Sequence, residues 1–392
     1  MKNLYLTASQ IKKELEKCLQ CPSKPCMQAC PAAVSPKDFI AAAQNGDWQS
    51  AAQQINAQNP LGEICGLICP DNFCRHACVR AKIGAPVLIP ALQAAIMQKA
   101  RQMNWLQAIN VAANGRRVAI IGAGPAGCGA VAELLKKGYA VEVFEREACI
   151  GGALNLIPTE RLPREIIAYE WQRLQQNHLL KLHLQTPIDD YETLLKQGYD
   201  GIIVTTGAPH LRALNIAGEN LALSYIEYLK NPQNYASTGR VVIVGGGAVA
   251  VDCAMTAKKQ GAKQVKMLVR RRLSDMRINE AEQQSLLDEK IEICPLTRLT
   301  KIEKNGDKLT LYTIHTEFDD SGHLQDVAGS QSVEQGFDYV VLALGSSGVA
   351  EIPAHPQIFY AGDVTTGGTT AVQALAAGKQ AAQKLIKQTT SS

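Results

Sequence analysis

Eight of the twelve cysteines fall within the first 78 residues, and their spacing is typical of metal ligands. In a reducing compartment, a dense block of thiols predicts metal binding rather than disulfides. Cysteine followed by proline, with three close cysteine partners, is typical of [4Fe–4S] ligation. Zinc is the alternative, because it also takes four thiolates, but zinc has no redox chemistry. The block consists of Cys18, Cys21, Cys26, Cys30, Cys65, Cys69, Cys74 and Cys78.

A glycine-rich turn after an apolar strand predicts a first nucleotide site. The strand 118–121 runs into a G-x-G-x-x-G turn, a helix follows, and a second strand, 140–144, ends on Glu145. Such glycines allow a tight turn and a close approach of backbone amides to a pyrophosphate, and the terminal acid suits a ribose hydroxyl. The residues of this turn are Gly122, Gly124, Pro125, Ala126 and Gly127.

A second glycine-rich turn of the same kind is followed by a strand that ends in basic residues instead of an acidic one. Its later strand, Gln264–Val269, is followed by Arg270, Arg271 and Arg272, where the first unit has Glu145. Arginine at this position suits the 2′-phosphate of NADPH, whereas an acid suits a free ribose hydroxyl. The alternative is a solvated basic turn. The pattern therefore assigns FAD to the first turn and NADPH to the second, which contains Gly245, Gly246, Gly247, Ala248, Val249 and Ala250.

A third strand and turn lie near the end of the chain. The stretch Ile358–Asp363 ends in Gly362 and Asp363, and a small-residue loop leads through Thr370 into a predicted helix, 371–386. Asp363 is expected to bind hydroxyls of a flavin ribityl chain, and the positive end of the helix is expected to support negative charge on the flavin ring. Taken alone, the same stretch also fits an ordinary closing strand, turn and helix.

The predicted elements give an α/β protein with an all-helical N-terminal iron–sulfur domain and two Rossmann-like domains. The pattern predicts helices at 11–19, 36–43, 48–55, 91–106 and 249–260, strands at 309–313 and 339–344, and a polar loop at 317–337. We expect the helical domain at 1–114, the FAD-binding domain at 115–236 and 346–392, and the inserted NADPH-binding domain at 237–345.

The composition of the chain argues against nucleic acid and membranes as partners. The net charge is only +4, and no lysine and arginine run with interleaved aromatic residues occurs, so nucleic acid is not expected as a partner. The sequence has no apolar stretch of membrane-spanning length and no signal peptide pattern, so we expect a cytoplasmic protein without membrane contact.

Two nucleotide folds in one chain predict a nicotinamide–flavin reductase, in which the cofactors carry the chemistry. The flavin also needs an outlet for its electrons. Cys149 and Cys253 stand alone in the sequence, so no cysteine pair lies beside the predicted flavin site. The N-terminal thiols are therefore the predicted outlet.

Taken together, these motifs resemble one known family of NADPH–FAD–iron–sulfur modules. The resemblance rests on the cysteine block, the run Asn59-Pro-Leu-Gly-Glu-Ile-Cys-Gly-Leu-Ile-Cys-Pro, the two glycine turns and Ala361-Gly-Asp363. The module occurs as the small (β) subunit of bacterial glutamate synthase, as the N-terminal half of dihydropyrimidine dehydrogenase or the small subunit of its bacterial form, and in ferredoxin–NADP transhydrogenase. It implies further cofactor contacts at Gly151, Gly152, Arg161 and Gly207.

The resemblance also implies a crossed set of cluster ligands. Cys18, Cys21, Cys26 and Cys78 would hold one [4Fe–4S] cluster. Cys30, Cys69 and Cys74 would hold the second, with a glutamine as the fourth ligand in the related dehydrogenase, which points to Gln93. Cys65 is the alternative to Gln93, because four residues separate Cys69 from Cys74 where the family usually has five.

We therefore expect an NADPH-oxidising electron-input subunit that passes electrons through FAD and two clusters to a partner. The partner would be a larger catalytic subunit with FMN and iron–sulfur centres, or ferredoxin. The main interpretation is a subunit like the small subunit of glutamate synthase, which the arginines slightly favour. The alternatives are the small subunit of a bacterial dihydropyrimidine dehydrogenase, favoured by the Asn-Pro-Leu-Gly run and Gln93, and a subunit of ferredoxin–NADP transhydrogenase. The alternative outside catalysis is a scaffold that holds clusters or zinc.

Overall fold

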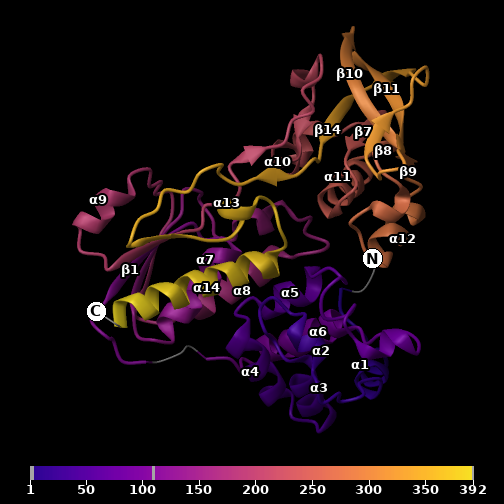
Figure 1. Cartoon of the computed structure of the whole chain (residues 1–392). Coiled ribbons are helices and arrows are strands. Elements are labelled where there is room, and N and C mark those ends of the chain that lie inside the picture. The colour runs from indigo at the N-terminus through magenta and orange to yellow at the C-terminus, as the bar shows by residue number, and fades with distance from the viewer. Residues whose placement is uncertain (1–3, 108–110, 391–392) are drawn as a thin grey trace. The chain divides into compact units, whose positions relative to one another are not determined.

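A computed structural model describes residues 4–107 and 111–390 of the chain (Figure 1). It divides into two compact units. The first unit comprises Met1–Asn155, Thr159–His210 and Ser347–Ser392, and the second comprises Leu156–Pro158 and Leu211–Ser346. The chain therefore leaves the first unit after residue 210 and returns to it at residue 347.

The N-terminal part of the first unit is helical, and local capping explains several helix starts. Thr7 and Gln10 form a capping box at the first helix, and Asp47 accepts the backbone N–H of Ser50 at the fourth. The third and sixth helices have proline in their first turn, where its missing N–H costs nothing. The elements are α1 (Ala8–Glu16), α2 (Pro25–Gln28), α3 (Pro36–Gln44), α4 (Trp48–Gln58), α5 (Gly62–Ile68), the 3₁₀ turn η1 (Val79–Lys82) and α6 (Ile89–Gln102).

The rest of the first unit is a five-stranded parallel sheet with the order β16-β4-β1-β2-β3. Its central strands are apolar on both faces, as expected for parallel strands covered by helices. The strands are β1 (Arg117–Ile121), β2 (Ala140–Phe144), β3 (Leu180–His183), β4 (Gly201–Val204) and β16 (Ile358–Tyr360). The helices are α7 (Pro125–Leu135), α8 (Arg164–Gln175), α9 (Tyr191–Lys196), α13 (Asp363–Thr366), α14 (Ala371–Thr390) and the 3₁₀ turn η2 (Gly152–Leu156).

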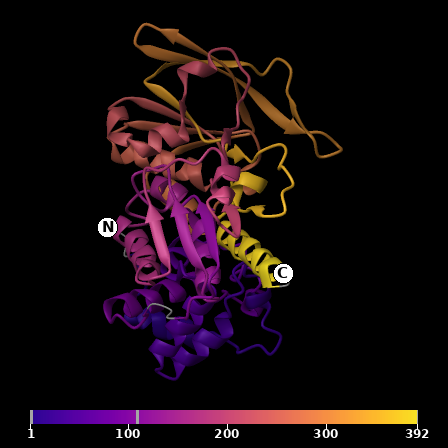
Figure 2. The ribbon, with the colours of Figure 1, turned by 90° about the vertical axis from the view of Figure 1, so that its left-hand side faces the viewer.

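Two glycines allow α7 and α14 to cross at very short distance. A Cβ atom on Gly378 would lie 1.8 Å from the carbonyl oxygen of Ala126, and one on Gly129 would lie 2.2 Å from the carbonyl oxygen of Leu375. Both ribbon views show α14, the yellow helix at the C-terminus, alongside the magenta elements of this unit (Figures 1 and 2). The last helix is therefore part of the same layer as the helix that follows the first glycine turn.

The second unit contains a second five-stranded parallel sheet with the order β6-β14-β7-β8-β9, and an antiparallel sheet of β10, β11, β12 and β13. The parallel strands are β6 (Leu223–Ser224), β7 (Arg240–Val244), β8 (Gln264–Val269), β9 (Glu292–Pro295) and β14 (Tyr339–Leu342). The antiparallel strands are β10 (Thr297–Asn305), β11 (Lys308–Phe318), β12 (Leu324–Asp326) and β13 (Ser332–Phe337). The other elements are α10 (Tyr225–Lys230), α11 (Ala248–Lys259), α12 (Glu280–Asp288), η3 (Glu219–Leu221), η4 (Pro232–Tyr235) and η5 (Leu273–Asp275), and the connections to the first unit carry β5 (His210–Leu211) and β15 (Ser346–Ser347).

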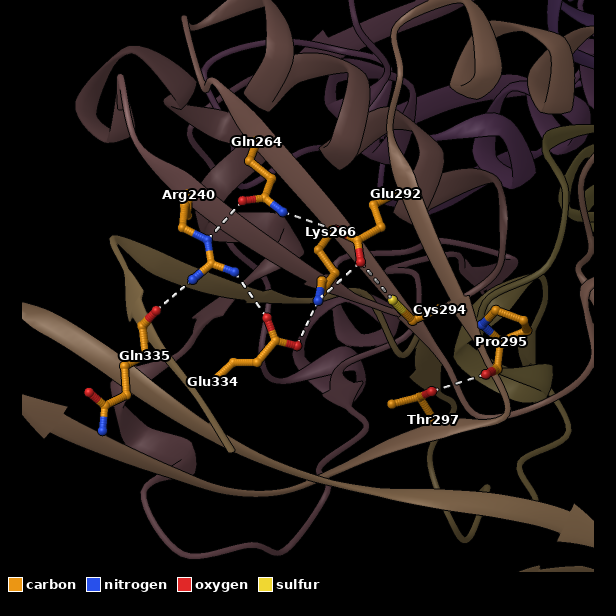
Figure 3. A network of polar contacts seen from close by, with 9 residues as sticks. All are labelled: Arg240, Gln264, Lys266, Glu292, Cys294, Pro295, Thr297, Glu334 and Gln335. Carbon is orange, nitrogen blue, oxygen red and sulfur yellow. Dashed lines mark hydrogen bonds and ion pairs between the residues drawn. The ribbon is translucent and has the colours of Figure 1, made fainter. Parts of the chain in front are cut away.

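A network of ion pairs ties the two sheets of the second unit together (Figure 3). Lys266 on β8 is buried and lies 2.6 Å from a carboxylate oxygen of Glu334 on β13 and 3.1 Å from one of Glu292 on β9. Although burial acts in the opposite direction, these two carboxylates raise the pKa of Lys266. Arg240 on β7 pairs with the same Glu334 at 2.9 Å. The network fixes the antiparallel sheet against the strands that lead to the second glycine turn.

The predicted fold class is confirmed, since an N-terminal helical region precedes two parallel Rossmann-like sheets. Individual elements differ from the prediction. The predicted polar loop at 317–337 is wrong, because β12 and β13 lie within it and pair with β11. The sixth helix ends at Gln102 rather than at residue 106, and α5 was not predicted.

Candidate functional site

In the first glycine turn, which lies in the first unit, backbone atoms approach one another so closely that side chains would not fit. Gly122 has φ of +110°, and a Cβ atom on Gly127 would lie 2.1 Å from the Gly122 carbonyl oxygen. Gly124 precedes α7, and no side chain caps that N-terminus in the described residues. These glycines therefore form a cradle that side chains would fill, with backbone amides at the positive end of a helix, as a dinucleotide pyrophosphate requires.

Other predicted residues converge on this turn. The Gly151 N–H donates to the Ala123 carbonyl at 2.8 Å, and a Cβ atom on Gly152 would lie 3.2 Å from the Cα atom of Gly124. Glu145 is buried at the end of β2 and accepts the Ala123 N–H at 2.8 Å and the Glu147 N–H at 2.9 Å. The carboxylate thus holds the turn in place while its remaining lone pairs stay available as acceptors.

The end of β16 reaches the same place. Gly362 has φ of +80°, and a Cβ atom there would lie 2.8 Å from the side chain of Ala126. Asp363 accepts the backbone N–H of Thr369 at 3.2 Å, and burial raises the pKa of its carboxyl group. Thr370 accepts the backbone N–H of Gln373 at 3.3 Å and thereby caps α14.

Two further predicted residues lie in connecting segments. Gly207 follows β4 with φ of +81°, and no atom would lie within 4 Å of a Cβ atom there. Arg161 lies half-buried in the segment between η2 and α8. Sequence reasoning missed Thr205, whose hydroxyl donates to the carbonyl oxygens of Ile121 and Gly122, at 3.0 Å each. The signal for Thr205 was its position directly after β4, beside the strand that enters the turn.

The second glycine turn repeats this geometry in the second unit. Gly245 has φ of +147°, and a Cβ atom there would lie 2.4 Å from the Ala343 carbonyl oxygen. Ala250 packs against Gly245, Gly247 precedes α11, and a Cβ atom on Gly246 would lie 2.9 Å from Val269. Ala248 and Val249 form the first turn of α11, where Val249 is partly exposed.

The arginines after β8 divide into two kinds. Arg272 stacks on Phe318 with its guanidinium carbon 4.4 Å from the ring centre. Arg270 and Arg271 are exposed, and the described residues provide no acidic partner for either. Sequence reasoning missed Arg277, whose backbone N–H donates to the Gly246 carbonyl at 3.0 Å and which forms a parallel bridge with Gly247. Arg277 therefore lies at the glycine turn, while Arg270 and Arg271 follow β8, the strand that pairs with the one leading into the turn.

The thiols of the N-terminal region are all free and form two groups. In the first group, burial raises the pKa of Cys18, and the neighbouring Cys78 and Cys21 thiols add to this effect. The chain brings these residues together although Cys78 lies 57 positions after Cys21. Cys18, Cys21, Cys26 and Cys78 line one cavity.

The second group brings four other thiols together. The pKa of Cys69 is raised mainly by its hydrogen bond with Cys65 and next by burial. The neighbouring Cys74 and Cys30 thiols add to this effect. Burial is also the main reason why the pKa of Cys74 rises to about 12, with Cys30 contributing. Gln93 on α6 is buried, and its side-chain N–H donates to the Gly62 carbonyl at 2.8 Å in the first turn of α5. Cys65 therefore lies beside Cys69, while Gln93 is held against the helix that carries Cys65.

The donor set fits iron–sulfur clusters, because each group supplies four soft thiols. Among residues 4–107 and 111–390, no three or more His, Cys, Asp or Glu side chains are arranged to hold a single metal ion.

Comparison with family models supports both halves of this description. Residues 2–105 match the model for dihydropyrimidine dehydrogenase domain II with a 4Fe–4S cluster. Residues 116–380 match the model for pyridine nucleotide–disulphide oxidoreductases, which covers more than half of the chain. The chain belongs to the pyridine nucleotide–disulphide oxidoreductase family. It is an NAD(P)- and FAD-dependent oxidoreductase with an iron–sulfur domain.

Two curated relatives cover nearly the whole of this oxidoreductase chain. The NAD-dependent dihydropyrimidine dehydrogenase subunit PreT of Escherichia coli K12 is 30% identical over 398 residues, which cover 95% of this chain and 93% of the relative. The NADP⁺-dependent formate dehydrogenase subunit beta of Moorella thermoacetica is 26% identical, and the match covers 91% of this chain and 59% of the relative. The resemblance to this family of modules is thereby confirmed.

Solved structures show the same fold for the oxidoreductase part. FprA of Mycobacterium tuberculosis matches with a TM-score of 0.61 and 17% identity, covering 70% of this chain and 85% of that chain. Thioredoxin reductase of Lactococcus lactis matches with a TM-score of 0.54 and 21% identity, covering 71% of this chain and all of that chain. No helix of the described residues is long and apolar enough to cross a bilayer.

In this member of the oxidoreductase family, buried ionisable side chains join the helical region to the sheet and helices around the first glycine turn, within the first unit. Glu170 on α8 is fully buried and accepts the backbone N–H of Glu63 at 2.7 Å in the first turn of α5. Arg173, one turn later, donates to the Pro60 carbonyl at 2.6 Å. Lys379 on α14 donates to the Gln58 carbonyl at 2.6 Å and the Ala32 carbonyl at 3.2 Å, two residues after Cys30. The thiol-bearing segments are thus held by helices of the glycine-turn fold.

Proposed function

We propose that the chain takes hydride from NADPH onto FAD and passes single electrons through two [4Fe–4S] clusters to a partner subunit. The observation that carries this proposal is the contact of Glu170 on α8 with the first turn of α5. This contact joins the thiol-bearing helix to the flavin-type fold in one compact unit. When bound, a flavin accepts a hydride from a nicotinamide and can release its electrons singly to iron–sulfur centres.

The flavin site is proposed at the first glycine turn. Gly122, Gly124, Pro125, Ala126 and Gly127 would place backbone amides at the pyrophosphate, and Glu145 would accept hydrogen bonds from the ribose. Asp363, with its pKa raised by burial, would contact ribityl hydroxyls. The N-terminus of α14 after Thr370 would stabilise negative charge on the flavin ring. Gly151, Gly152, Arg161, Gly207 and Gly362 complete the proposed set.

The nicotinamide site is proposed at the second glycine turn, with NADPH as the donor. Gly245, Gly246, Gly247, Ala248, Val249 and Ala250 would hold the pyrophosphate. Arg270 and Arg271 would bind the 2′-phosphate, and Arg277 is added to them because its backbone bonds to Gly246. The names of the relatives differ on this point, since PreT is NAD-dependent and the Moorella protein NADP⁺-dependent. The choice of NADPH over NADH therefore rests on the exposed arginines.

Two clusters are proposed at the two thiol groups. Cys18, Cys21, Cys26 and Cys78 would hold the first, in keeping with the cavity they share. Cys30, Cys69 and Cys74 would hold the second with Gln93 as the fourth ligand, and Cys65 is the alternative because it lies beside Cys69. Cys65→Ala and Gln93→Leu separate the two. Iron counts and electron paramagnetic resonance should show loss or conversion of the second cluster for the true ligand alone.

For the partner, the relatives support a dihydropyrimidine dehydrogenase more than a glutamate synthase. Proteins named as dihydropyrimidine dehydrogenase subunits match 95% of this chain. We therefore propose an FMN- and iron–sulfur-containing pyrimidine-reducing subunit as the electron acceptor. The glutamate synthase interpretation, slightly favoured by the arginines, becomes the second candidate.

The proposal is tested on protein purified without oxygen. We expect a flavin spectrum with a broad iron–sulfur shoulder that NADPH bleaches, and about eight irons per chain if two clusters form. Added to a pyrimidine-reducing partner, the chain should support NADPH oxidation that depends on uracil. Support of a glutamate synthase large subunit with glutamine and 2-oxoglutarate would favour the second candidate. A colourless protein that binds zinc would overturn the enzyme proposal.

A further inference from the structure

The first thiol group is the shallower of the two. Its four thiols, Cys18, Cys21, Cys26 and Cys78, are all partly exposed and line one cavity. Cys65, which belongs to the second group, is only 2% exposed. The first group is therefore the one whose four thiols are all partly exposed, which favours it as the exit for electrons that leave the chain.

The surface around the first group is positively charged. Lys24, Lys37 and Arg80 line the cavity formed with Cys18, Cys21, Cys26 and Cys78, and none of the lining residues is acidic. Asp38, next to the cavity, pairs with Lys24 at 2.7 Å and offsets its charge, so the net positive charge comes from Lys37 and Arg80. Lys82, on the same η1 turn as Arg80, is exposed, and the described part of the chain gives it no ion pair. Residues 4–107 carry ten lysines and arginines against six aspartates and glutamates. Two of those six acids, Glu14 and Glu63, are buried.

Two large apolar side chains lie beside these cations. Leu19 follows Cys18, lines the cavity and is 49% exposed. Ile83 follows the η1 turn after Lys82 and is 66% exposed. Apolar surface bordered by polar residues is typical of sites that bind another protein.

We propose that this face, defined by Leu19, Lys24, Lys37, Arg80, Lys82 and Ile83, docks an electron-carrying protein with an acidic surface. The inference rests on the proposed function, because it requires a one-electron centre at the first thiol group. Opposite charges would steer the partner towards the thiols, and the two apolar side chains would be covered in the complex. Each NADPH gives NADP⁺, one proton and two electrons, so two partner centres are each reduced by one electron.

Two haem proteins of opposite charge serve as probes: acidic cytochrome b5 and basic cytochrome c. The full chain is reduced with NADPH without oxygen, and the reduction of each probe is followed by stopped-flow absorbance at several salt concentrations. For the wild-type chain, we expect the rate with cytochrome b5 to fall as salt rises and the rate with cytochrome c to rise.

The test variant is Lys37→Glu/Lys82→Glu. It should slow cytochrome b5 reduction about tenfold at low salt and speed cytochrome c reduction. The rate of cytochrome b5 reduction should then no longer fall as salt rises. The matched control is Lys137→Glu/Lys384→Glu, which makes the same change in charge at exposed positions on α14 and after α7. An equal loss in this control would overturn the docking face, because net charge alone would then explain the effect.

A second variant, Leu19→Ala/Ile83→Ala, keeps the test valid if the charge variant loses iron. It should raise the cytochrome b5 concentration that gives the half-maximal rate, without changing the salt dependence. Unchanged kinetics in both variants would refute the docking face while leaving the proposed function intact. A wild-type chain without iron–sulfur absorbance would instead refute the proposed function.

Discussion

The buried carboxylate of Glu170 accepts the backbone N–H of Glu63 at 2.7 Å, across 107 positions of sequence. A second oxygen lies 3.5 Å from the backbone N–H of Ile64. Glu170 therefore caps α5 from another helix, where the first turn would otherwise leave backbone donors unpaired in the interior. Because α5 carries Cys65 and Cys69 directly follows its last residue, this cap fixes where the second thiol group lies.

Glu170→Ala should release this cap and lower the free energy of unfolding by about 2 kcal/mol or more, since buried donors lose their acceptor. Glu170→Gln should cost less, because an amide oxygen still accepts the Glu63 N–H. The measurement is thermal unfolding together with iron retention on dilution. Glu165→Ala, an exposed carboxylate on the same helix, is the control and should change neither. Equal behaviour of Glu170→Ala and the control would contradict the role of the cap.

Gly378→Ala should separate α7 from α14. Its Cβ atom would lie 1.8 Å from the Ala126 carbonyl oxygen, and backbone cannot yield at that distance without shifting a helix. We expect loss of most bound flavin and a fall in stability of roughly 3 kcal/mol, in the upper range for a single substitution. Gel filtration measures the loss of bound flavin, and denaturant unfolding measures the fall in stability. Gln380→Ala, exposed on the same helix, should leave both unchanged.

Replacement of the free arginines should change the choice of nicotinamide cofactor. Arg270→Ala and Arg271→Ala should each raise the KM for NADPH about tenfold to a hundredfold, since a charge-assisted contact to phosphate contributes roughly 1.5–3 kcal/mol. The KM for NADH should stay nearly constant. Arg272→Ala is the informative comparison, because its guanidinium stacks on Phe318. If all three variants weaken NADPH and NADH equally, the arginines act on the fold and not on the 2′-phosphate.

Removal of iron should loosen one part of the first unit selectively. The thiols lie in segments with little regular structure, since α2 has four residues and η1 has four. After treatment with a chelator, limited proteolysis should therefore cut within residues 18–34 and 69–88. The parallel sheet should remain uncut, because its strands are paired and covered. Simultaneous digestion of both parts would show that the clusters hold the whole unit together.

Local patterns were enough to predict the parts of the site that depend on short stretches of chain. β2 and β8 have the predicted bounds, because an apolar run bounded by a charge and a turn is decided locally. The glycines at 122, 124 and 127 were predicted from the geometry that any pyrophosphate turn needs. The pairing of thiols across the first group came from the resemblance, because spacing alone does not decide which distant cysteines meet.

Features that depend on contacts between distant residues could not be predicted from the sequence. Helix α5 is only seven residues long and draws its cap from Glu170, so it carries no local start signal. β13 is largely polar and exists because β11 offers it a pairing edge. Arg277 has no special spacing from the glycines, and its place at the turn follows from one backbone bridge. In each case the deciding partner lies far away in the chain.

The return of the chain to its first unit at residue 347 sets an order for biosynthesis. On the ribosome, β1, β2 and β4 emerge well before β16 and α14, and residues 211–346 are made between them. The inserted unit can fold on its own during this interval, whereas the parallel sheet of the first unit is incomplete until β16 and α14 are made. We therefore expect the second unit to fold first, and the proposed flavin site to form only after β16 and α14 have been made.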